Sequence, residues 1–74
     1  MTINEFRGWW KVRAIRQADE AYADRPPHWQ SCRAMTIADG ITRGEKFWRK
    51  HRKFLAGVTL TEWTDRVQKR EALR

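Results

Sequence analysis

Six cationic side chains are crowded into one short stretch of the chain. These residues are Arg43, Lys46, Arg49, Lys50, Arg52 and Lys53. Lysine and arginine spaced along a helix can contact successive phosphates of a polyanion and release its condensed counterions. If residues 42–56 form a helix, the cations share one face and an apolar set, which includes Phe47, Trp48 and Leu55, shares the other. We therefore expect the six cations to bind nucleic acid.

The positive charge of the chain is concentrated in this stretch. The sequence has 16 Lys and Arg against 9 Asp and Glu, a net charge of +7, and Glu45 is the only acid among the six cations. Like charges four residues apart on a helix, such as Lys46 and Lys50, repel each other. A face that is merely solvated usually mixes both signs. The pattern favours a polyanion or an acidic protein partner over a solvated face.

The residues before and after Gly40 resemble a helix-turn-helix. Arg33–Asp39 would be the first helix, residues 40–42 the turn, and Arg43 would begin the basic second helix. This interpretation favours duplex DNA and a role in transcription regulation. Arg33 or Arg16 would add a phosphate contact to those of the six cations. The fit is partial, since Lys46 stands where the second helix should be apolar. The stretch that carries the six cations has no Asn, Gln or Ser. We therefore expect its side chains to contact phosphates more than base edges.

A second surface indicates a protein partner. Trp9 and Val12 fall outside the apolar stripe of the first helix. These two side chains would close the edge of the core or form an exposed apolar patch for a partner or a second copy, as in a homo-oligomer. Trp29, close after two prolines, would cover the core, stack on an unpaired base or anchor a protein interface. The alternative function is therefore a protein-binding inhibitor or adaptor, which docks its basic or Trp-rich face on an acidic surface of a larger complex.

The remaining reactive side chains do not form a recognisable catalytic or metal site. His28 and Cys32 are four residues apart, but two ligands do not make a metal site. Asp19, Glu20 and Asp24 have the spacing of exposed counter-charges. No phosphate loop, nucleophile motif or metalloprotease motif is present. We expect no metal, no cofactor and no enzymatic activity.

The cations need a helical scaffold, and the sequence predicts one. The expected helices are Thr2–Ala23, Pro27–Asp39, Thr42–Ala56 and Thr59–Leu73. Thr2, Thr42 and Thr59 each have Glu three residues later, the pattern of a capping box. Gly40 and Gly57 are expected to end helices in the left-handed conformation. The prediction is an all-α fold, a compact bundle of about four short helices, in which a helix-turn-helix-like unit is one option.

Size and composition set the remaining expectations. A chain of 74 residues is expected to form one domain, residues 1–74. One face of the first helix supplies apolar residues for the core: Ile3, Phe6, Trp10, Ala14, Ala18 and Ala21. A single cysteine excludes an intramolecular disulfide and suits a reducing compartment. Without a signal sequence or a long apolar run, we expect a soluble, cytoplasmic protein that does not enter membranes.

Overall fold

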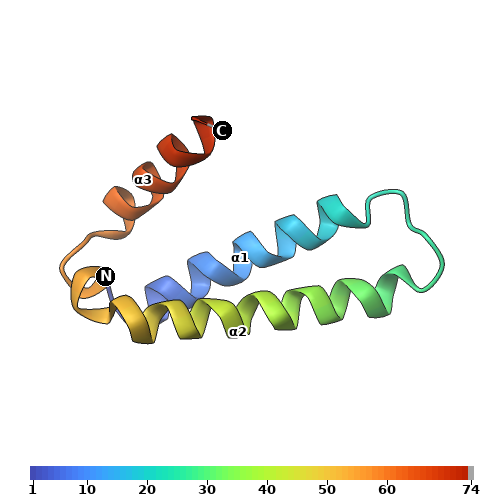
Figure 1. Ribbon diagram of the computed structural model, residues 1–74, viewed down its shortest axis with the longest axis horizontal. Helices are drawn as coiled ribbons and strands as arrows, with labels where there is room; N and C mark the ends of the chain where they lie inside the picture. Colours follow the sequence, from blue (N-terminus) through green and yellow to red (C-terminus); the bar gives the residue numbers. More distant parts are fainter. Residues whose placement is uncertain (74) are drawn as a thin grey trace.

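The computed structural model describes residues 1–73, and these form three helices (Figure 1). Helix α1 is Ile3–Ala21, α2 is Trp29–Ala56 and α3 is Leu60–Ala72. The all-α class is confirmed. The expected count of four helices is wrong, because the second and third predicted helices are one continuous helix.

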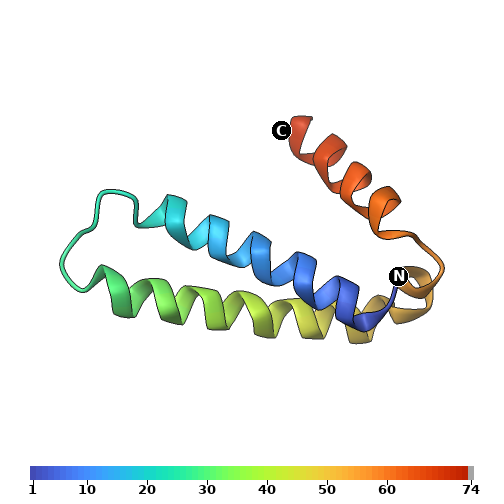
Figure 2. The ribbon, with the colours of Figure 1, turned by 180° about the vertical axis from the view of Figure 1, so that it is seen from behind.

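The two long helices form an antiparallel hairpin, and α3 diverges from it. Figures 1 and 2 show α1 lying along α2, with α3 turning back from the far end of α2 at an angle to α1. The molecule measures 43 × 26 × 16 Å, so it is an elongated hairpin with a third helix attached. The connection between α1 and α2 contains two prolines, and both Arg25 (φ 50°) and His28 (φ 61°) are left-handed there.

Of the three helix starts predicted from capping boxes, those at Thr2 and Thr59 are confirmed. Thr2 accepts from the backbone N–H of Glu5, and the Glu5 carboxylate accepts from the backbone N–H of Thr2, which completes the capping box. Thr59 accepts in the same way from the backbone N–H of Glu62. The third start is wrong, since the Thr42 hydroxyl lies inside α2 and donates to the Ala38 carbonyl at 3.1 Å.

Gly40 lies inside α2 and does not end a helix, and its lack of a side chain allows α1 to pack closely against α2. Neither Gly40 nor any other glycine within residues 1–73 has a positive φ. A Cβ atom at Gly40 would lie 3.0 Å from the Cβ of Ala14, and one at Gly44 would lie 2.6 Å from the Trp10 ring. These glycines therefore let α1 approach the backbone of α2. The expected turn at residues 40–42 is absent, so no helix-turn-helix is formed there.

An aromatic cluster forms the core at the end of the hairpin where α3 begins. Phe6 is fully buried, and its ring centroid lies 5.3 Å from those of Trp10 and Trp48 and 6.1 Å from that of Trp63. Farther along α1 the contact surface narrows to the buried alanines at positions 14 and 18. Met35 of α2 lies outside this core and is 72% exposed.

Helix α2 leaves helical geometry once, at His51 (φ −118°, ψ 19°). The imidazole packs on Phe47 with 4.5 Å between ring centroids. Beyond this kink, Leu55 is fully buried, and the amino group of Met1 donates to the Leu55 carbonyl at 2.9 Å. Gly57 follows in right-handed geometry (φ −90°, ψ −1°), so the expected left-handed end is wrong here too.

None of the helices in residues 1–73 is long and apolar enough to cross a membrane.

Candidate nucleic-acid interface

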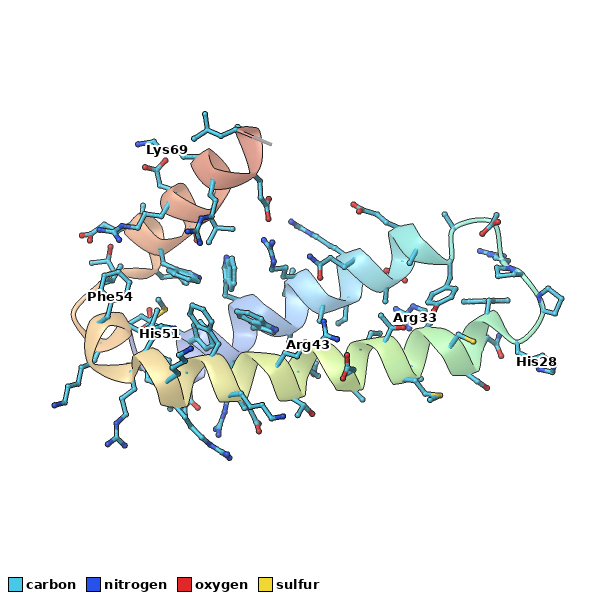
Figure 3. All side chains as sticks on the ribbon, in the orientation of Figure 1. His28, Arg33, Arg43, His51, Phe54 and Lys69 are labelled. Atoms are coloured by element: carbon cyan, nitrogen blue, oxygen red, sulfur yellow. The ribbon has the colours of Figure 1, made fainter. Side chains whose placement is uncertain are left out.

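The six predicted cations lie on the C-terminal half of α2, and all six are exposed. Figure 3 shows long, nitrogen-tipped side chains projecting from this half of α2 on the side away from α1 and α3. The arrangement follows from the helical period, because the apolar residues between them turn inward. Gly44, Phe47, Trp48 and Leu55 face the core.

Five of the six cations form no ion pair with any residue of the described chain. We call these five the cationic face: Lys46, Arg49, Lys50, Arg52 and Lys53. The sixth, Arg43, lies 3.1 Å from the Asp39 carboxylate one turn earlier in α2. An exposed pair of this kind contributes little to stability, but it partly neutralises Arg43 as a phosphate ligand.

The kink at His51 gives the cationic face a concave end. A concavity of about 360 Å³ lies there, lined by Arg49, Lys50, His51, Arg52, Lys53 and Phe54. We call it the kink concavity. Phe54 is 46% exposed, and the Arg66 guanidinium of α3 lies 5.1 Å from the centroid of its ring. A fifth cation therefore stands beside the four that line the concavity.

The two arginines suggested as support lie elsewhere. Arg33 faces α1 in the first half of α2, and its Nε donates to the Asp19 carboxylate at 2.5 Å (Figure 3). This hydrogen bond and the charge of Asp19 raise the pKa of the Arg33 guanidinium. Arg16 belongs to α1 and lines the groove between α1 and α3. Neither belongs to the cationic face.

The predicted partner residues are divided between two places. Trp9 packs edge-on against Trp63, with 5.5 Å between ring centroids, and lines a groove with Val12, which is half exposed. This α1–α3 groove holds about 730 Å³ and is also lined by Leu60 and Val67. Trp29 lies at the opposite end of the hairpin, where the Arg25 guanidinium covers its ring at 5.4 Å.

The sequence analysis missed two cations of α1. Arg7 and Lys11 are both exposed and lie beside a pocket of about 280 Å³ between α1 and α2. The other lining residues are Phe6, Trp10, Ile41, Gly44 and Glu45. Arg7 and Lys11 are four residues apart on one helix, and this spacing could have indicated from the sequence that they lie side by side. We call this cavity the aromatic pocket.

The structure does not gather metal-binding side chains in the part that it describes. No group of three His, Cys, Asp or Glu residues there could hold an ion. His28 precedes α2 and Cys32 is half-buried one turn later.

Comparisons of the chain with family models, with curated proteins and with solved structures found no match.

Proposed function

We propose that the protein binds nucleic acid through phosphate contacts made by the cationic face. The observation that carries this proposal is the set of five exposed cations of α2 that no carboxylate of the described chain neutralises. Like charges at Lys46/Lys50 and Arg49/Lys53 each cost about 0.2–0.5 kcal/mol in an isolated helix. A polyanion removes that repulsion and gains entropy from the counterions that it releases.

The mode of binding follows from the shape of α2. Its inner side packs on α1, and the cations of its outer side are open to a ligand. The helix-turn-helix that favoured duplex DNA is absent, and the cationic face has no Asn, Gln or Ser. Arginine and lysine without such neighbours contact phosphate more readily than they select a base sequence. We therefore propose binding with little sequence preference and strong dependence on salt.

The test is titration of labelled duplex and single-stranded DNA over a range of salt concentrations. If the five cations each neutralise one phosphate, log K against log salt should have a slope of about −4.5 on duplex and about −3.5 on a single strand. Arg49→Glu combined with Lys53→Glu should abolish binding. Lys69→Glu combined with Arg70→Glu is the matched control, since it changes the net charge equally on exposed positions of α3. No binding at low salt, or equal loss in both double variants, would contradict the proposal.

The second candidate function is binding to a protein through the α1–α3 groove. The observation in its favour is that Val12, Leu60 and Val67 line this groove and α3 buries none of its residues in the described chain. A photoreactive residue placed at position 12 should then give a discrete adduct that the same residue at position 35 does not. Position 35 is the control because Met35 is more exposed than Val12 and lies outside the groove.

A further inference from the structure

The aromatic pocket has the composition of a site for a flat, apolar ring that carries negative charge nearby. Phe6, Trp10 and Ile41 line it together with the exposed cations Arg7 and Lys11. Phe6 is fully buried, so the aromatic ring that a ligand can reach is that of the partly exposed Trp10. Its volume of about 280 Å³ is small for a drug-sized ligand and suits a single ring system. The indole of Trp10 offers such a ring a stacking surface.

The ring of Trp10 is held in place by the backbone of α2. A Cβ atom at position 44 would lie 2.6 Å from the indole, so the ring fills the space that a side chain would take. The indole Nε1 donates to the Gly40 carbonyl at 2.6 Å, which fixes the orientation of the ring. A ligand that stacks on a ring already fixed in this way loses less entropy on binding.

Shared lining residues connect the aromatic pocket to the cationic face. A smaller cavity, lined by Ile3, Arg7, Glu45, Trp48 and Arg49, shares Arg7 and Glu45 with the aromatic pocket. Arg49 in turn lines the kink concavity. From position 41 to position 53 this path follows α2 for about 18 Å, at the rise per residue of a helix. A flexible polyanion can therefore contact the kink concavity and reach the pocket.

We infer that the ligand of this path is a single-stranded nucleic acid, with one unpaired base in the aromatic pocket. This inference rests on the proposed function and adds the class of nucleic acid to it. Arg7, Lys11 and Arg49 contact the phosphates on either side of that base. Glu45, the one acid on the path, repels phosphate and accepts from the N–H groups of the base. A base within a duplex cannot enter without losing its pairing and stacking.

The experiment compares three probes by fluorescence anisotropy at one salt concentration. They are a single strand of about eight nucleotides, an abasic phosphodiester chain of the same length, and a duplex. A strand of about eight nucleotides is within the site sizes of single-strand binding proteins. The single strand should bind about tenfold more tightly than the abasic chain, because one stacked base contributes at about this level. Equal affinity for both chains overturns the inference and leaves the proposed function standing. Failure of all three probes overturns both.

Two variants test whether the base occupies the aromatic pocket. Ile41→Trp fills the pocket without changing a charge, and it should remove the preference for the single strand over the abasic chain. Met35→Trp introduces the same side chain on the exposed side of α2 and should keep the preference. Preference retained in an Ile41→Trp protein that melts like the wild type overturns the inference.

A third variant covers the case in which Ile41→Trp does not fold. Arg7→Gln combined with Lys11→Gln alters only exposed side chains. It should make the salt slope on the single strand shallower by about 1.4 and leave the slope on duplex unchanged. An equal change on both ligands overturns the inference. A free mononucleotide that binds as tightly as the strand would also overturn it, because the pocket would then act without the cationic face.

Discussion

The indole Nε1 of Trp10 donates a hydrogen bond to the backbone carbonyl of Gly40, with 2.6 Å between the two atoms. This bond joins a side chain of α1 to the backbone of α2. Such an approach is possible because residues 40 and 44 carry no side chain on the face of α2 that meets α1. The two glycines therefore determine how closely the hairpin packs.

Adding one methyl group at Gly44 should destabilise the protein. The new Cβ would lie 2.6 Å from the Trp10 ring, and the hydrogen bond to Gly40 prevents that ring from swinging away freely. Overpacking of this kind costs about 1–3 kcal/mol, whereas alanine gains up to about 1 kcal/mol over glycine in a helix. We expect Gly44→Ala to lower the free energy of unfolding by about 1–2 kcal/mol in urea denaturation.

Gly8→Ala is the matched control for this change. Gly8 lies inside α1, and a Cβ there would meet nothing within 4 Å. Only the helix propensity then changes, so Gly8→Ala should raise the free energy of unfolding by about 0.5–1 kcal/mol. If both variants shift stability in the same direction, close packing at Gly44 does not limit the hairpin.

The same glycines explain where prediction of the fold failed. Sequence patterns identified the helix caps at Thr2 and Thr59 because these depend on residues three apart in the chain. The run Gly40-Ile41-Thr42 also has the pattern of a helix end followed by a helix start. Whether glycine ends a helix or admits a neighbouring one depends on Ala14 and Trp10, which lie about 30 residues away in the chain. Local patterns contain no information about that contact.

The candidate site was predictable for the same local reason, and only in part. The helical period places the cations of α2 on one face and Phe47 and Trp48 on another, so the exposure of the cations follows from their spacing alone. The contribution of Arg7 and Lys11 depends on which residues of α1 lie opposite Gly44, and a single sequence does not specify that register. The kink at His51 was also not predictable, since no proline or glycine precedes it within six residues.

The capping box of α1 should make stability depend on pH in the acid range. Hydrogen bonds from the backbone N–H and the hydroxyl of Thr2 lower the pKa of Glu5 below its ordinary value of 4.5. A carboxylate with a lowered pKa contributes stability that is fully present above the ordinary value and is lost as pH falls through the folded-state pKa. Glu5→Gln should therefore lose less stability than the wild type as pH falls from above 4.5 through the lowered pKa of Glu5.

A direct measurement of the Glu5 titration completes this prediction. NMR should show the carboxyl of Glu5 titrating below 4.5 in the wild type and closer to that value in Thr2→Ala. The shift should return only partway, because the backbone N–H of residue 2 remains as the stronger donor. An unchanged pKa in Thr2→Ala would mean that the hydroxyl does not take part.

Helix α3 should open before the hairpin does. None of its residues is buried, and its contacts with α1 are the packing of Trp63 on Trp9 and Phe6 and the ion pair between Arg13 and Glu71. Few buried contacts imply a low free energy of local opening. We expect amides of residues 64–72 to exchange with deuterium faster than those of residues 10–18. Trp63→Ala should accelerate exchange in α3 far more than Glu71→Gln, because exposed ion pairs contribute little.

Removal of the acid beside Arg43 should strengthen binding to nucleic acid. Asp39 pairs with Arg43 at 3.1 Å, and neutralising it both frees that cation and removes a charge that repels phosphate. Asp39→Asn should raise the affinity for single-stranded DNA roughly two- to fivefold, the scale of one surface charge contact, and steepen the salt slope by about 0.7. Asp65→Asn is a close control, since Asp65 pairs with Lys69 at 3.0 Å with the same spacing and similar exposure on α3. Both variants change the net charge equally, so only a position effect separates them. Equal gains in affinity would show that total charge governs binding, and the assignment of phosphate contacts to α2 would then be wrong.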